Sequence, residues 1–102
     1  MKIFWTKFAL SSLSEIFRYY KDNVSYTIAN NIRNGVLSST NQLSKHPTSG
    51  QIEESLIDLK NGHRYIIRGN YKIIYKIQNH KLYITDVFDT RQNPEKMTPR
   101  NK

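Results

Sequence analysis

The sequence predicts an α+β fold in which a short N-terminal strand and a helical hairpin precede a three-stranded antiparallel meander. Two observations support this prediction. Apolar residues recur at helical spacing before Pro47, whereas the chain after Gly62 is dense in β-branched and aromatic residues. The length of 102 residues, with 37% hydrophobic side chains, is typical of a single domain, which we expect to span residues 1–102.

The first expected element is a strand at the N-terminus. Lys2 to Trp5 includes three consecutive large apolar residues, which is typical of a strand covered on both faces. Thr6 can then cap a helix, because its side-chain oxygen can accept from an amide of the first turn. We expect this helix to end at Asp22-Asn23, and its apolar stripe is Ala9, Leu13, Ile16, Phe17 and Tyr20.

A second helix is expected after a short turn. Ser25 can cap it, and its stripe is Ala29, Ile32, Val36 and Leu43. Pro47 disfavours helical geometry in the residue before it, so we expect this helix to stop near His46. The two helices would then form an antiparallel hairpin.

The second half of the chain reads as a turn, an irregular stretch and three strands. Residues 51–62 have no clear period and are expected to be a loop with one short turn. Gly69-Asn70 predicts a two-residue hairpin loop. The expected ranges are 47–50 for the turn and 63–68, 71–77 and 82–88 for the strands.

The hairpin loop also predicts a register. Arg68 and Tyr71 flank it as partners, so Arg64 should face Tyr75. Residues of equal parity share a face of a strand, which places Arg64 with Arg68 on one side and Lys72 on the other unless a bulge intervenes. The alternative of one long helix with a cation at every fourth position is rejected, because Tyr, Ile, Gly, Asn and His dominate residues 63–77.

Positive charge is concentrated in the last 43 residues. The net charge is +8, and residues 60–102 carry ten basic side chains against three acidic ones. Such a field attracts nucleic acid, acidic protein segments or anionic membrane surfaces. We expect about residues 92–102 to form a basic tail, and we expect partner-binding residues among the cations Arg64, Arg68, Lys76 and Lys96.

Several classes of protein are excluded by composition. No apolar run approaches the roughly 18 residues of a membrane helix, and Lys2 and Lys7 interrupt any signal-peptide core, so we expect a cytoplasmic protein without a membrane partner. The absence of cysteine excludes disulfides, cysteine-based zinc sites and thiol nucleophiles.

The order of these elements and three segments resemble the RelE/ParE superfamily of toxins from bacterial type II toxin–antitoxin modules. The segments are LSKHPTSG at 43–50, YIIRGNYKIIY at 65–75 and VFDTRQNP at 87–94. The resemblance extends from Ile3 to about Met97. It implies a toxin that arrests growth and is neutralised by a cognate antitoxin, in a complex that can contain a toxin dimer.

The superfamily has two main targets. ParE-like members poison DNA gyrase, whereas RelE-like members cut mRNA in the ribosome without a metal or other cofactor. For a RelE-like site, the resemblance places transition-state cations at Arg91 and Lys72 and leaves His63, or a lysine or tyrosine with a shifted pKa, as the base. The tyrosine expected after the last strand is replaced by Met97, which cannot exchange a proton.

We therefore rank action on gyrase above ribosome-dependent mRNA cleavage. A non-enzymatic nucleic-acid-binding module, with Arg91, Lys96, Arg100 and Lys102 along phosphates, is a further alternative. An inert relic that only binds antitoxin is another.

Overall fold

The computed structural model describes all 102 residues and confirms the expected α+β fold. One mixed sheet has the strand order β1-β5-β4-β3-β2, with β1 parallel to β5 and the other pairs antiparallel. The strands are β1 Ile3–Trp5, β2 Gln51–Ile52, β3 Arg64–Arg68, β4 Tyr71–Gln78 and β5 Lys81–Asp89. The α-helices are α1 Lys7–Asn23, α2 Tyr26–Ser39 and α3 Met97–Arg100, and the 3-10 helices are η1 Asn41–Ser44, η2 Glu54–Leu59 and η3 Pro94–Lys96.

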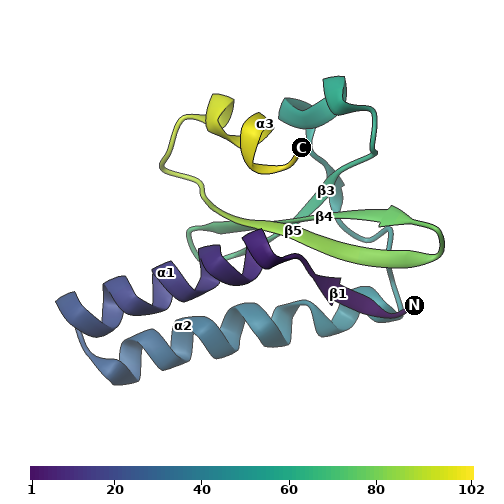
Figure 1. Cartoon of the computed structure of the whole chain (residues 1–102). Helices are drawn as coiled ribbons and strands as arrows, with labels where there is room; N and C mark the ends of the chain where they lie inside the picture. The colour runs from purple at the N-terminus through teal and green to yellow at the C-terminus, as the bar shows by residue number, and fades with distance from the viewer.

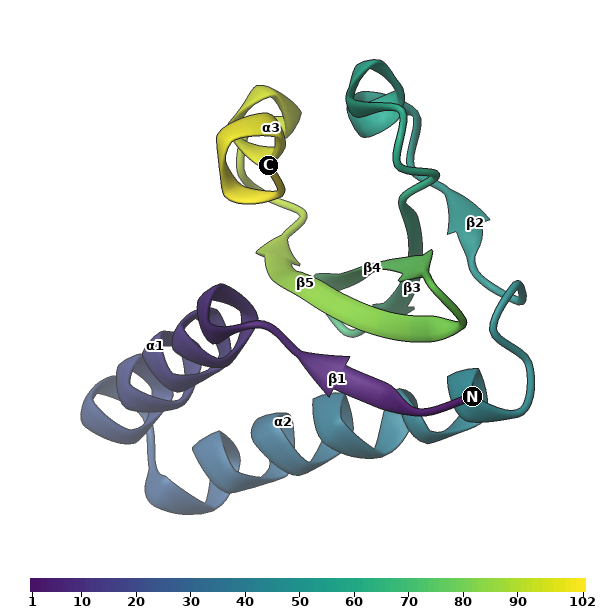
Figure 2. The same ribbon diagram turned by 45° about the vertical axis from the view of Figure 1, so that its right-hand side comes forward.

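The molecule has three layers. The hairpin of α1 and α2 covers one face of the sheet, which we call the inner face, and η2 and α3 lie over the opposite, outer face (Figure 1). Figure 2 shows β1 running beside β5 at one edge of the sheet and β2 at the other. None of the helices is long and apolar enough to cross a bilayer.

The helical hairpin follows the predicted caps. The side chains of Thr6 and Ser25 accept hydrogen bonds from the amides of Ala9 and Ile28, both at 3.1 Å. The predicted end near His46 is wrong, because α2 stops at Ser39. The hydroxyls of Ser38, Ser39 and Thr40 each donate to the carbonyl three residues earlier, and the chain tightens into η1.

Residues 51–62 are more ordered than the expected loop. Gln51 and Ile52 form β2 and pair with β3, which adds an edge strand to the sheet. Glu53 then begins η2 by accepting from the amide of Ser55. Neither element could be predicted from the sequence, because a two-residue strand and a short 3-10 helix do not show a hydrophobic periodicity.

The predicted hairpin register is confirmed. Arg68 pairs with Tyr71 and Arg64 with Tyr75, so the two pairs of basic residues lie on opposite faces of the sheet. A bulge at Thr85 shifts the register between β4 and β5. The inner face buries Tyr71, Ile73 and Tyr75 against the hairpin.

A second, smaller core lies on the outer face. Leu56 of η2 and Met97 of α3 pack there against Ile74 and Phe88 of the sheet. The C-terminal residues are therefore not the free basic tail that the charge pattern suggested. Met97 is 1% exposed and Asn101 3% exposed, since α3 returns to the sheet and contacts η2.

Candidate functional site

Arg91 lies directly after β5, on an exposed turn. Its guanidinium binds the Asp89 carboxylate through two hydrogen bonds, Nε to Oδ1 at 2.9 Å and Nη2 to Oδ2 at 2.7 Å. These bonds hold the pKa of Asp89 below its usual value. The same contact, with a smaller effect from Tyr20, raises the pKa of Arg91. Arg91 is thus a permanent cation whose charge is already paired.

A cavity of about 480 Å³ opens beside Arg91 between α1 and the end of β5. Tyr20 of α1 and Tyr71 of β4 meet at its wall, with their hydroxyl oxygens 3.4 Å apart. Burial and this contact raise the pKa of Tyr71, so the phenol stays protonated near neutral pH. The cavity carries both charge signs, because Glu15 and Asp89 line it together with Arg91.

Lys72 lies on the outer face, away from Arg91. Its Nζ is 2.6 Å from Oε1 of Glu53, which is 4% exposed, and 4.2 Å from the centre of the Tyr65 ring. The ion pair ties β4 to the start of η2 across the outer core. The positive charge of Lys72, which was expected to contact a phosphate, is therefore already paired with the carboxylate of Glu53.

His63 is buried rather than accessible. It is 2% exposed, and neither ring nitrogen has a hydrogen-bond partner. Burial lowers its pKa, and the positive charge of Lys76 lowers it further. Met97, at the position where the RelE-like pattern has a tyrosine, is an apolar core residue.

The four cations expected to bind a partner occupy different surroundings. Arg64 donates to the carbonyl oxygens of Gly50 at 2.8 Å and Thr48 at 3.3 Å, so it holds the turn before β2. Arg68 is exposed and rests against α2 at Gly35, and it lines a second cavity of about 260 Å³. Lys76 lies half-buried on the outer face and Lys96 is exposed in η3.

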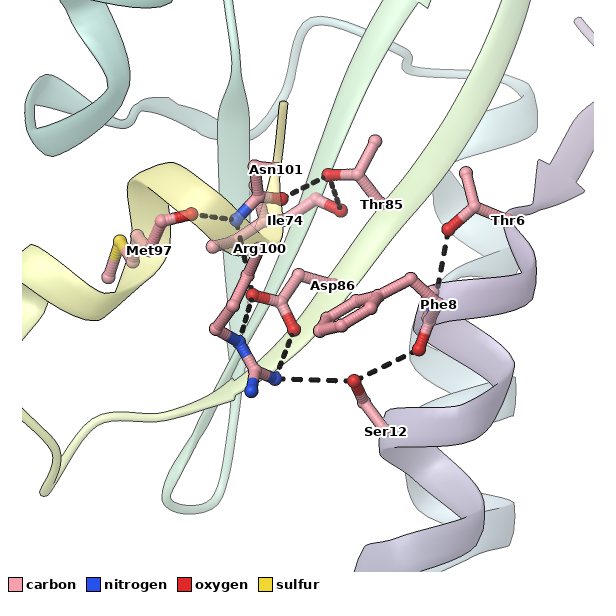
Figure 3. Close-up of polar contacts among 10 residues, drawn as sticks. Thr6, Phe8, Ser12, Ile74, Thr85, Asp86, Met97, Arg100 and Asn101 are labelled. Carbon is pink, nitrogen blue, oxygen red and sulfur yellow. Dashed lines mark hydrogen bonds and ion pairs between the residues drawn. The ribbon is translucent and has the colours of Figure 1, made fainter.

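The structure also contains a polar network that the sequence reasoning missed. Asp86 of β5 is 0% exposed, and its carboxylate accepts from Nε of Arg100 at 2.9 Å and from Nη2 at 2.6 Å. Figure 3 shows that the same guanidinium reaches Ser12 of α1 and lies beside the ring of Phe8. Arg100 is therefore a structural cation rather than a phosphate contact.

Asn101 extends this network to the bulge. Its amide nitrogen donates to Asp86 at 3.1 Å and its amide oxygen accepts from Thr85 Oγ1 at 2.6 Å (Figure 3). One sequence signal could have indicated this arrangement, because Asp86 is an acid in the middle of a strand and is followed by the apolar Val87 and Phe88. A buried carboxylate needs a cationic partner.

These positions do not form one catalytic centre. Arg91 lies beside the helical hairpin, Lys72 is bound to Glu53 on the other face of the sheet, and His63 is enclosed. Arg91 and Lys72 are therefore held by different partners in different surroundings and do not converge on one site. No three histidine or carboxylate side chains gather in a way that could hold a metal ion.

Comparisons with known proteins agree with this architecture. Residues 3–94 match the family described as the ParE toxin of the type II toxin–antitoxin system parDE. A solved chain described as the chromosomal ParDE toxin–antitoxin system from P. aeruginosa superposes with a TM-score of 0.73 at 16% identity, covering 87% of this chain and 95% of that one. No curated protein sequence matches the chain. Because the family match spans nearly the whole sequence, the chain belongs to the ParE family of type II toxins.

Proposed function

We propose that this toxin acts in the cytoplasm on DNA gyrase, arrests growth, and is neutralised by a cognate antitoxin. Membership of the ParE family supports the general assignment. The choice of gyrase rests on one structural observation, the separation of the candidate catalytic cations Arg91 and Lys72 on opposite sides of the sheet.

RNA cleavage by attack of the 2′-hydroxyl requires several groups around one phosphate. A base must stand near the hydroxyl, an acid near the leaving oxygen, and cations near the developing negative charge. Here Lys72 is neutralised by Glu53, and His63 cannot reach a bound strand. Inhibition of gyrase by binding requires no such set, so it fits the geometry better than mRNA cleavage does.

An acidic antitoxin segment fits the charge distribution. The chain carries a net charge of +8, and Arg68, Lys76 and Lys96 form none of its three ion pairs. Unpaired surface cations steer an oppositely charged partner and increase its association rate. Arg64 would contribute to antitoxin binding only indirectly, because its guanidinium donates to the Gly50 carbonyl and so holds the turn before β2.

Induced expression with and without co-expression of the cognate antitoxin tests this proposal. We expect arrest only in its absence, with DNA synthesis stopping before protein synthesis, induction of an SOS reporter, and cleaved plasmid DNA trapped on purified gyrase. The mass of the purified toxin–antitoxin complex will show whether it contains a toxin dimer.

The Arg91→Ala variant separates the two targets. In a ribosome-dependent endonuclease, loss of a transition-state cation lowers the rate by about 100- to 1000-fold. We expect gyrase-dependent arrest to persist in Arg91→Ala, as it should in the surface control Lys21→Ala. Protein synthesis that stops first, with truncated mRNA, would establish the endonuclease instead, and unimpaired growth with folded protein would refute both.

A further inference from the structure

Two aromatic rings stack on the outer face of the sheet without joining either core. Phe4 of β1 pairs with Tyr83 of β5, and their ring centres are 5.6 Å apart with an angle of 29° between the planes. Phe4 is 39% exposed and Tyr83 is partly exposed. Neither residue belongs to the inner or the outer core cluster. Core packing therefore does not account for this pair.

Three lysines occupy positions next to the ring pair on the same face of the sheet. Lys76 of β4 lies opposite Tyr83, and Nζ of Lys81 is 5.7 Å from the centre of the Phe4 ring. Lys2 is two residues before Phe4 and continues the pairing, because its carbonyl accepts from the amide of Leu82. Residues of equal parity share a face, so these side chains belong to one aromatic–lysine patch on three adjacent strands, shown side by side in Figure 2.

The lysines of this patch carry uncompensated charge. The three ion pairs of the chain involve Lys72, Arg91 and Arg100, and none involves a patch lysine. The charge of Lys76 is also felt by the buried His63, whose pKa it lowers. The patch is therefore a cationic surface with an exposed aromatic stack at its centre.

We propose that the aromatic–lysine patch (Lys2, Phe4, Lys76, Lys81 and Tyr83) binds single-stranded nucleic acid. Unpaired bases continue the stack of Phe4 and Tyr83, and the lysine ammonium groups contact the phosphates. Exposed rings beside cations are the combination that holds single strands without sequence preference, since every base presents a π-face. A duplex keeps its bases stacked inside and cannot use the rings.

This inference goes beyond action on gyrase, because the patch lies on the face of the sheet opposite the hairpin and needs no gyrase to bind. It also differs from the arrangement expected from the sequence, in which the tail cations Arg91 and Arg100 followed the phosphates. Both of these arginines are bound to aspartates.

Fluorescence anisotropy with labelled oligonucleotides tests the patch. The probes are 12-residue deoxythymidine and uridine strands, which distinguish DNA from RNA, and a duplex of equal length. We expect the single strands to bind at 50 mM salt. The slope of log K against log salt should be about −2, because each of three phosphate contacts contributes about −0.7. Lys81→Ala should reduce this slope by about 0.7, and Lys21→Ala should leave it unchanged.

Ring variants provide the second test. Phe4→Ala and Tyr83→Ala should each weaken binding by about 5- to 150-fold, the range measured for loss of one base stack. Phe4→Leu keeps an apolar side chain in the short strand β1 but removes the ring, so it should still weaken binding. Phe4→Trp keeps an aromatic ring and should bind like the wild type. Tyr26→Leu, at an aromatic residue that is 60% exposed on α2, is the matched control.

Circular dichroism of every variant confirms that a loss of binding is not a loss of fold. The inference is overturned if the probes do not bind at 50 mM salt, if the duplex binds as tightly as the single strands, or if Phe4→Leu and Tyr26→Leu bind alike. Binding only to an acidic antitoxin peptide, lost in Phe4→Leu, would also overturn it by assigning the patch to a protein partner.

Discussion

The carboxylate of Asp86 joins the C-terminal segment to the sheet, so its removal tests how that segment is held. In Asp86→Ala the guanidinium of Arg100 loses two hydrogen bonds and the amide of Asn101 loses one. The bonds from Arg100 to Ser12 and from Asn101 to Met97 remain. The variant therefore leaves a partly buried cation without its counter-charge.

The magnitude follows from burial. Removing one partner of a buried ion pair typically costs about 3–5 kcal/mol. Asp86 is completely buried, but the Arg100 side chain is 27% exposed and can turn partly toward water. We therefore expect the lower end, a loss of about 3 kcal/mol in the free energy of unfolding. For a chain of this length, that corresponds to a fall in Tm of about 12–24 °C.

Urea unfolding followed by circular dichroism and by the fluorescence of Trp5, the single tryptophan, measures this loss. Glu95→Ala removes an exposed carboxylate from the same segment and should change stability by less than about 0.5 kcal/mol. The double variant Asp86→Leu/Arg100→Met replaces both charges with apolar groups and should recover most of the loss. If Asp86→Ala unfolds at the same urea concentration as Glu95→Ala, the network does not hold the C-terminal segment.

Four further substitutions have defined outcomes. Gly35→Ala should stabilise the protein by up to about 1 kcal/mol, because the added Cβ would meet only the flexible end of the Arg68 side chain. Gly50→Ala should destabilise it by about 1–3 kcal/mol, because the added Cβ would lie 2.5 Å from the buried Tyr75 hydroxyl. Shifts of the urea midpoint in the same direction for both variants would contradict this reasoning. Tyr75→Phe removes a hydroxyl that accepts from the Gly50 amide and donates to a carbonyl, and thermal melting should show a loss of about 1–2 kcal/mol. The pKa of His63 is lowered in the folded state, so the unfolded chain binds the proton more readily and stability should fall as the pH drops below about 6.5. His63→Leu should reduce this fall between pH 7.5 and 5.5, and an unchanged pH profile would show that the His63 ring is not responsible.

Much of the architecture could be predicted because it depends on local rules. The caps at Thr6 and Ser25 and the loop at Gly69-Asn70 are set by neighbouring residues, and they define the hairpin of helices and the register of β3 and β4. Short elements were missed for the same reason. β2 and η2 are stabilised by contacts with distant residues, such as the ion pair of Glu53 with Lys72.

Two of the three paired cations depend on contacts between distant parts of the chain. Lys72 is bound to Glu53, 19 residues away in the sequence, and Arg100 is bound to Asp86, 14 residues away. Arg91 differs, because its partner Asp89 is only two residues earlier and the contact is local. The sequence pattern did not show which carboxylates Lys72 and Arg100 would meet.

The amino-acid sequence alone determined the fold class, the register of β3 with β4 and the basic character of this toxin, since propensity, turn chemistry and net charge act between near neighbours or add over the chain. Tertiary structure decided which cations remain free to bind a partner. Adjacent residues of a β-strand point to opposite faces of the sheet, and the C-terminal helix α3 packs on the outer face. The division of Arg91 from Lys72, and the gathering of Phe4 and Tyr83 with three unpaired lysines, exist only after the strands have paired.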